Sequence, residues 1–340
     1  MYQTRITDRE AGQRFDKYLH RILPNAGSSF LYKMLRKKNI TLNGKKADGS
    51  EKTVEGDCVA IYFADETLAK FMGKEASGAA VSGGETQKVP DTDYLSAYRK
   101  ITGVHILYEN DHILIVDKPA GVLSQKAERT DMSLNEWLIG YLLQSGYVTK
   151  EALFTYKPSV CNRLDRNTSG IVLCAKSLKG AQLLGELLGN RTIHKYYQLY
   201  VKGTLQKEQL IDGYLRKDEK HNKVYIDTCD ACGAPIRTRY KPLRVEKDKT
   251  LLEVELITGK PHQIRAHLAG IGHPLLGDYK YGDRTWNETY RRKYQVTSQL
   301  LHAYKVVFPT LAAPFEDISG KTFYAKLPEI FRRVSEENDA

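Results

Sequence analysis

The stretch "NRLDRNTSGIVLCAKS", from Asn162 to Ser177, joins a charged loop to an apolar segment. The second half is short, apolar and bounded by polar residues, which predicts a buried strand. In the loop, Asp165 stands between Arg163 and Arg166. A guanidinium favours the ionised form of a nearby carboxylate, and an ionised carboxylate can act as a nucleophile toward a sugar carbon. A structural ion pair at the start of a strand is the alternative interpretation of this loop.

Other segments on both sides of this stretch also have the composition of strands. They are separated mostly by turns rather than by regular crossover helices, and include "HILIVDKP", "YYQLYVKG", "RTRYKPLRVEK", "TLLEVELIT" and "AYKVVFP". Two helices are predicted among them, "SLNEWLIGYLLQ" and "KGAQLLGELLG". This order favours an α+β domain, built on a largely antiparallel or mixed sheet with flanking helices, over a doubly wound fold. We place this domain at residues 103–335.

A second charged cluster, "ITGKPHQIRAHLAGIGHPLLGDYKYG", runs from Ile257 to Gly282. Arg265 lies at the head of a predicted helix in this cluster. His262 and His267 are five residues apart, whereas a separation of four would turn both toward one metal ion. The pair Cys229 and Cys232 has no second pair of ligands nearby. No metal site is therefore predicted.

The first 64 residues form a separate predicted module with two amphipathic helices followed by a hairpin. The second helix, in "SSFLYKMLRKKN", has an apolar face and an opposite basic face made of Lys33, Arg36, Lys37 and Lys38. Residues 65–102 contain a stretch rich in Gly, Ser and Ala with no apolar period, which predicts a flexible linker. The alternative interpretation of the basic face is a solvated surface with no partner.

The composition favours a polyanionic partner. Fifty-two Lys and Arg residues outnumber 41 Asp and Glu, for a formal net charge of +11. Nucleic acid is the first expectation and an anionic membrane surface the second. No apolar run is long enough to span a membrane, and five scattered cysteines form no disulfide framework. We expect a cytoplasmic protein. The motifs GxxxxGK[ST], GxGxxG, HExxH and GxSxG are absent, so nucleotide hydrolysis, hydride transfer and triad hydrolysis have no support.

Several of these segments are similar to the RluA-type pseudouridine synthases. "NRLDRNTSG" resembles their HRLDxxTSG signature, "HKYYQLYVKG" their KxYxxxVxG segment, and "TGKPHQIRAHLAGIGHPLLGDYKYG" their TGRxHQIRxH and GxPxxGDxxYG motifs. The matches follow the family's order over about residues 104–310. The N-terminal module resembles the S-four-type RNA-binding domain, named after a ribosomal protein, which many members of the family carry.

The resemblance implies an enzyme that isomerises uridine to pseudouridine in RNA without cofactor or metal. It implies that Asp165 is the catalytic carboxylate, acting as nucleophile or as base. Tyr197 would pack on the flipped base and is a candidate for removing the proton of carbon 5. Arg265 would hold Asp165 ionised. Arg163 would enter the RNA stack, and the other expected RNA contacts are Arg166, Lys260, His262 and the basic face of the N-terminal module.

Two positions depart from the family motifs. Asn162 replaces the usual histidine before RLD, and Lys260 replaces the arginine of TGR, so the bidentate fork is lost while the charge is kept. Large-subunit ribosomal RNA is the expected substrate and transfer RNA the second, and we expect a monomer. The alternative is a catalytically silent RNA-binding or ribosome-assembly factor of the same fold, although such a protein has no need for Asp165, Tyr197 and Arg265 together.

Overall fold

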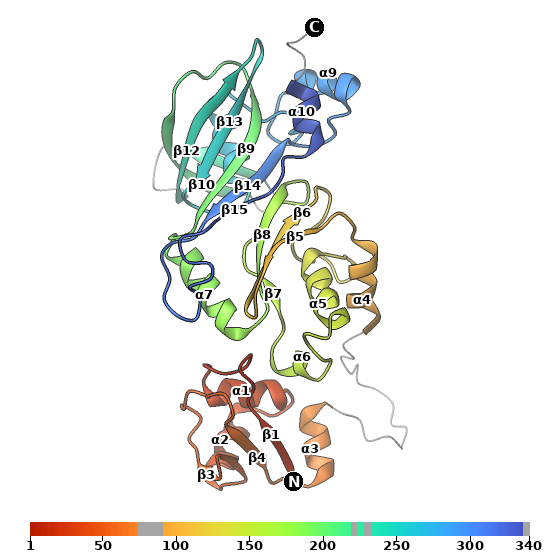
Figure 1. The fold of residues 1–340 in the computed structure, drawn as a ribbon, viewed down its shortest axis with the longest axis vertical. Helices are drawn as coiled ribbons and strands as arrows, with labels where there is room; N and C mark the ends of the chain where they lie inside the picture. The colour runs from red at the N-terminus through yellow and green to blue at the C-terminus, as the bar shows by residue number, and fades with distance from the viewer. Residues whose placement is uncertain (74–90, 219–222, 228–232, 336–340) are drawn as a thin grey trace.

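The computed structural model describes residues 1–73, 91–218, 223–227 and 233–335. They form a small N-terminal module and a larger α+β domain (Figure 1). The small sheet is antiparallel, with strands in the order β1 (Tyr2–Arg5), β4 (Cys58–Ile61), β2 (Ile40–Leu42) and β3 (Lys45–Lys46). Its apolar side chains share one core with the helices α1 (Phe15–Ile22) and α2 (Ser28–Arg36).

The basic face predicted for the second helix is exposed, but it is only partly helical. Lys33 and Arg36 lie on α2, Lys37 is its C-terminal cap, and Lys38 has a left-handed backbone with φ 59°. All four side chains are exposed. The opposite face of α2 is buried, as its apolar spacing predicts.

The large sheet has eleven strands within the described residues. Nine follow one another in the order β11 (Lys223–Asp227), β10 (Gln209–Asp218), β12 (Ala234–Val245), β13 (Lys249–Leu256), β9 (His194–Lys202), β14 (Leu301–Val307), β8 (Ser169–Ala175), β6 (Ile113–Lys118) and β5 (His105–Glu109). Two short strands pair at the side, β15 (Thr322–Tyr324) with β14 and β7 (Ser159–Val160) with β8. Only β14 and β8 pair in parallel; the other strand pairs of the described residues are antiparallel. The predicted mixed sheet is confirmed.

The parallel pair brings two backbones unusually close. Gly170 on β8 has φ 113°, and a Cβ atom on it would lie 2.3 Å from the carbonyl oxygen of Ala303 on β14. Only glycine fits there, because any side chain would overlap that backbone. The loop that carries Asp165 leads into β8 directly before this close approach of the two backbones.

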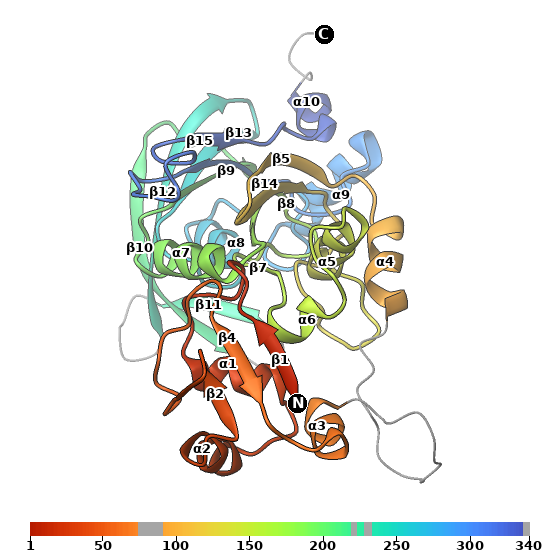
Figure 2. The same ribbon diagram turned by 60° about the horizontal axis from the view of Figure 1, so that its bottom comes forward.

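Helices cover both faces of the sheet next to that loop. Alternate residues of β6 and β8 point to opposite faces. One set packs with α5 (Leu134–Gln144) and the other with α7 (Leu178–Gly189), and Figure 1 shows these helices on either side of the strands. Figure 2 shows α8 (Gln263–Gly270) deep within the domain, in that view between β10 and α5. The remaining helices are α6 (Ala152–Thr155), α9 (Arg284–Tyr294) and α10 (Glu329–Ser335).

The segment predicted as a linker, residues 65–102, carries a helix at each end, which corrects that prediction at both ends. Phe71 of α3 (Asp65–Met72) packs on Phe30 of the N-terminal module, with ring centroids 4.6 Å apart. The other helix, α4 (Asp91–Lys100), packs closely on Gly140 of α5. In both helices, apolar side chains three or four residues apart pack on the neighbouring core: Leu68, Phe71 and Met72 of α3, and Tyr94 and Tyr98 of α4. Residues 74–90 lie outside the described residues.

The N-terminal module contacts the large domain near α6. The guanidinium of Arg9 lies 3.8 Å from the ring centroid of Tyr147, and Arg21 Nη1 donates to the carbonyl oxygen of Thr155 at 2.9 Å. No helix in the described ranges is both long and apolar enough to cross a membrane.

Candidate active site

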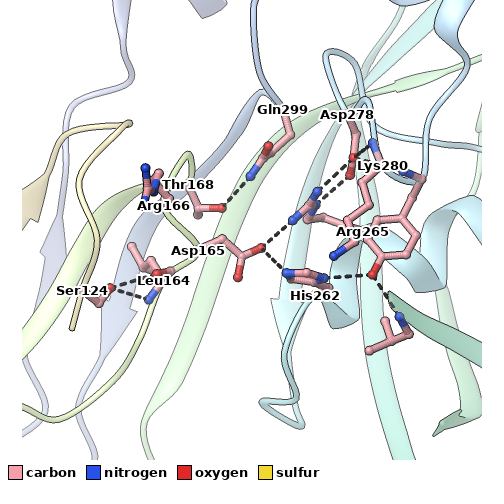
Figure 3. Close-up of polar contacts among 12 residues, drawn as sticks. Ser124, Leu164, Asp165, Arg166, Thr168, His262, Arg265, Asp278, Lys280 and Gln299 are labelled. Carbon is pink, nitrogen blue, oxygen red and sulfur yellow. Dashed lines mark hydrogen bonds and ion pairs between the residues drawn. The ribbon is translucent and has the colours of Figure 1, made fainter. Parts of the chain in front are cut away.

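Asp165 lies in the loop between β7 and β8, and this loop is anchored from two sides. Ser124 Oγ donates to the carbonyl oxygen of Leu164 at 2.9 Å and accepts from the Leu164 amide at 2.9 Å (Figure 3). On the other side of Asp165, the Gly121 amide donates to the carbonyl oxygen of Arg166 at 2.9 Å. Both neighbours of Asp165 are therefore fixed to the segment that follows β6.

A fully buried lysine, Lys118, also binds the Asp165 loop. Its Nζ donates to the carbonyl oxygens of Pro119, Val122 and Arg166 at 3.0, 2.7 and 3.2 Å. Burial lowers the pKa of Lys118 to about 7, whereas the charge of Asp165 opposes that shift. Since all three partners are acceptors, only the ammonium form satisfies each of them. Lys118 is thus a cation that ties the Asp165 loop to the preceding turn.

Arg265 of α8 holds the Asp165 carboxylate. Its Nη1 donates to Asp165 Oδ2 at 2.8 Å, across 100 residues of sequence. Its Nε and Nη2 donate to the two carboxylate oxygens of Asp278 at 2.7 and 3.0 Å. The two arginines beside Asp165 in the sequence, Arg163 and Arg166, are exposed. The ion pair suggested by "RLDR" is therefore formed with a remote arginine.

The Arg265–Asp278 pair is buried and stays charged. Burial alone would lower the pKa of Arg265, but its hydrogen bonds to Asp278 and Asp165 outweigh burial and raise it. Burial likewise disfavours the Asp278 carboxylate, yet the bond from Arg265 and the backbone amides of Lys280 and Tyr281 lower its pKa. Asp278 has no exposed surface, whereas the Asp165 side chain is 27% exposed. The partly exposed carboxylate of Asp165 is thus held by the buried ion pair of Arg265 and Asp278.

Tyr197 lies on β9, opposite Ala303 of β14 and Val254 of β13. Its side chain is buried, and burial together with the charge of Asp165 raises its pKa, so the phenol stays protonated at neutral pH. The neighbouring Tyr196 faces the other side of the sheet, where Lys305 Nζ lies 3.9 Å from its ring centroid. The two tyrosines alternate because successive residues of a strand point to opposite faces of the sheet.

His262 reaches the same carboxylate from the start of α8. Its Nε2 lies 3.8 Å from Asp165 Oδ2, and its Nδ1 is 2.8 Å from the Tyr281 hydroxyl. The Tyr281 ring also lies 5.2 Å from the Arg265 guanidinium carbon. Burial is the main reason why the pKa of His262 is lowered, although Asp165 opposes the shift.

The other predicted RNA contacts are spread over the surface. Lys260 is exposed just before His262, while the four basic residues around α2 belong to the N-terminal module and make no contact with the Asp165 loop. Asn162, at the position of the family's histidine, binds the backbone of β8: its Oδ1 accepts from Leu173 N at 2.7 Å. Among the described residues, Asn162 thus bonds to the strand backbone and not to the Asp165 carboxylate.

Three residues of the site were not predicted: Lys118, Asp278 and Tyr281. Asp278 and Tyr281 both lie in "GDYKYG", a segment recognised as a motif without roles for its side chains, and Lys118 lies in "VDKP". Among the described residues, no group of three or more His, Cys, Asp or Glu side chains is arranged to hold a metal ion. Cys229 and Cys232 lie outside the described residues.

Comparison with known proteins identifies the family. The family described as RNA pseudouridylate synthase matches residues 112–270. The ribosomal large subunit pseudouridine synthase C of Rickettsia bellii is 31% identical over 330 residues, which cover 94% of this chain and 96% of the relative. The chain belongs to the RluA-type RNA pseudouridine synthases. The sequence-based prediction of an RNA pseudouridine synthase is confirmed.

Two further matches extend this result. The Escherichia coli protein of the same name as the Rickettsia relative is 30% identical to this pseudouridine synthase, over 83% of the chain and 80% of the relative. The solved structure of human RNA pseudouridylate synthase domain containing 4 superposes with a TM-score of 0.55 at 21% identity, covering 70% of this chain and 94% of that one. That likeness supports the fold.

Proposed function

We propose that this pseudouridine synthase isomerises specific uridines of large-subunit ribosomal RNA, with Asp165 as its catalytic carboxylate. The observation that carries the proposal is the Asp165–Arg265 contact of 2.8 Å, in which a partly exposed carboxylate is held by a buried guanidinium. The relatives from Rickettsia bellii and Escherichia coli, both named ribosomal large subunit pseudouridine synthase C, support the choice of substrate.

In the proposed reaction, the Asp165 carboxylate attacks carbon 1′ of the ribose while the bond from carbon 1′ to N1 of uracil breaks. The free base turns, and its carbon 5 forms a bond to carbon 1′ as the carboxylate leaves. A base then removes the proton of carbon 5, and N1 takes up a proton. Substrate and product are isomers, so the atom balance needs no oxidant, reductant or second substrate. Arg265 keeps the carboxylate ionised and oriented throughout.

We assign Tyr197 to packing on the base. A buried phenol whose pKa is raised is a poor base at neutral pH, which argues against its removing the carbon 5 proton. Its aromatic ring is instead suited to contact an extruded base. Arg163 is exposed two residues before Asp165 and is suited to fill the space that the base leaves.

We further propose that residues 1–64 dock RNA through the exposed basic residues around α2, as the resemblance to an RNA-binding domain implies. The proposed enzyme is a monomer of the cytoplasm. The thiols of Cys58, Cys161 and Cys174 are unpaired, in keeping with a reducing compartment. Light scattering on the purified protein tests whether it is a monomer in solution.

The experiment for the main proposal is a pseudouridine map. Large-subunit ribosomal RNA and total transfer RNA, both made without modifications, are incubated with the wild-type enzyme or with Asp165→Ala, and every pseudouridine is located by sequencing. We expect wild-type sites in the ribosomal RNA and none with the variant. Sites confined to transfer RNA would refute the substrate, and no site in either RNA would favour a silent RNA-binding factor.

A further inference from the structure

The Asp165 carboxylate meets its neighbours through one of its two oxygens (Figure 3). Oδ2 receives the hydrogen bond from Arg265 and also faces His262 Nε2, 3.8 Å away. Among the described residues, none donates a hydrogen bond to Oδ1. The distance to His262 exceeds a hydrogen bond by about 1 Å. The imidazole thus faces the carboxylate without a hydrogen bond to it, and a substrate oxygen beside the pair can lie within hydrogen-bond distance of both.

The backbone of His262 is held in a conformation that few residues other than glycine adopt. Its φ of 54° and ψ of 13° are left-handed, which is costly for a residue with a Cβ atom. Its side chain makes no capping hydrogen bond at the start of α8. Gln263 binds the preceding turn instead, where its Oε1 accepts from the Lys260 amide at 3.1 Å. With this left-handed backbone, the imidazole lies with its Nε2 facing Asp165.

The contacts of Tyr281 favour the tautomer of His262 that carries its proton on Nε2. The amide of Val224 on β11 donates to the Tyr281 hydroxyl at 3.1 Å. The hydroxyl proton is then available for His262 Nδ1 at 2.8 Å. A neutral imidazole that accepts at Nδ1 carries its proton on Nε2. His262 thus points an N–H donor at the space beside Asp165 Oδ2.

We propose that His262 and Asp165 together bind the 2′-hydroxyl of the target ribose. An atom between them must accept a hydrogen bond from Nε2 and donate one to the carboxylate. A single hydroxyl oxygen, about 2.8 Å from each partner, does both. Phosphate and carbonyl oxygens have no proton to donate. The 2′-hydroxyl is attached to the carbon next to carbon 1′, the carbon that Asp165 attacks. This assignment rests on the proposed function.

The test is a cycle of one enzyme variant and one substrate change. An RNA oligonucleotide spanning a mapped site is prepared with uridine or 2′-deoxyuridine at the target position only. His262→Asn is the variant, because asparagine tolerates the left-handed backbone but is too short to reach Asp165. Single-turnover rates are measured for the four combinations.

We expect the wild-type enzyme to be about 10- to 100-fold slower on the deoxy substrate, as for a lost hydrogen bond to a preorganised site. His262→Asn should lose a similar factor on the uridine substrate and almost nothing more on the deoxy substrate. Such non-additivity is the sign of a direct contact. His262→Gln, which keeps an N–H donor, should restore part of the rate on uridine alone.

Two further variants separate this role from a structural one. Tyr281→Phe removes the hydroxyl that fixes the tautomer, and should cost less than His262→Asn while showing the same non-additivity. His273→Asn is the matched control, because this half-buried histidine binds the carbonyl oxygen of Lys202 and has no contact with Asp165. His273→Asn should leave the ratio of the rates on the uridine and 2′-deoxyuridine substrates unchanged.

Equal losses on both substrates with His262→Asn would overturn the assignment, as would a wild-type enzyme that treats the two substrates alike. Failure of the proposed function gives a different result, because the wild-type enzyme would then make no pseudouridine in the uridine substrate at all.

Discussion

The cations around Asp165 and those around α2 are held in opposite ways. Arg265 is buried and uses three of its nitrogens on two carboxylates. The basic residues Lys33, Arg36, Lys37 and Lys38 are exposed and form no ion pair with the described residues. A charge that must orient one reacting group is fixed before the substrate arrives. A charge that only attracts a polyanion works as well on a flexible chain in water. Mutation should therefore affect the two regions differently.

The largest effect is expected for Asp165→Ala. Loss of the catalytic carboxylate should lower the isomerisation rate by about 10⁴-fold or more. RNA affinity should stay within a few-fold, because Arg265 keeps its two bonds to Asp278 and the fold is retained. Single-turnover pseudouridine formation and filter binding measure the two quantities. A residual rate close to wild type would place the reacting group elsewhere.

Arg265→Lys should have the next largest effect. Lysine cannot bridge both carboxylates with a planar fork, so we expect a loss of roughly 10²- to 10³-fold in rate, the scale for removing one preorganised contact. Arg237→Lys is the matched control, since this exposed arginine also pairs with an aspartate, Asp212 at 2.7 Å. If both variants lose equally, the effect of Arg265→Lys is not specific to the site.

Neutralising the basic residues around α2 should act on binding alone. With all four changed to glutamine, we expect RNA affinity to fall roughly 10- to 100-fold near 0.15 M salt, and the slope of log affinity against log salt to decrease by up to about 3. The loss should be greatest at low salt, and the rate with saturating RNA should not change. A series of binding isotherms from 0.05 to 0.5 M salt checks this.

The matched control for that variant carries the same change on α9, at the exposed residues Arg284, Arg291, Arg292 and Lys293. An equal loss from the α9 variant would mean that the whole basic surface binds RNA, without a special role for the N-terminal module.

The smallest effect concerns His302, a buried residue of β14 whose Nδ1 lies 2.8 Å from the Ser169 hydroxyl of β8. Burial lowers its pKa from 6.5 to about 4. Between these values the unfolded chain binds the proton and the folded chain does not, so stability falls as the pH falls. We expect a loss of about 2 kcal/mol in unfolding free energy between pH 7.5 and 5.

Urea unfolding at the two pH values measures that loss of unfolding free energy. In His302→Gln the loss should be smaller by about 2 kcal/mol, because the titrating imidazole is gone. Activity at pH 7.5 should barely change, which separates this histidine from His262. An undiminished loss in His302→Gln would assign the pH dependence to other groups.

Patterns in the sequence predicted the fold class, and the family motifs identified Asp165, Arg265 and Tyr197 as candidate site residues. The family resemblance named Arg265 as the partner of Asp165. The local "RLDR" pattern alone pointed to Arg163 and Arg166 instead, because the Arg265 contact depends on the tertiary path of the chain. Asp278, Tyr281 and Lys118 were missed for the same reason. Each has a partner in another segment: the Arg265 side chain for Asp278, the Val224 amide for Tyr281 and the Arg166 carbonyl oxygen for Lys118. Such distant partners leave no local pattern in the sequence.

The separation of Asp165 and Arg265 along the chain has a consequence during synthesis. Their contact joins positions 100 residues apart. At a translation rate of about 5–20 residues per second, the aspartate is made roughly 5–20 seconds before its arginine partner. A growing polypeptide therefore cannot carry a competent centre before Arg265 has been made, although the ribosome that makes it contains RNA of the kind we propose as substrate. Synthesis of Arg265 thus sets the earliest point at which modification can begin.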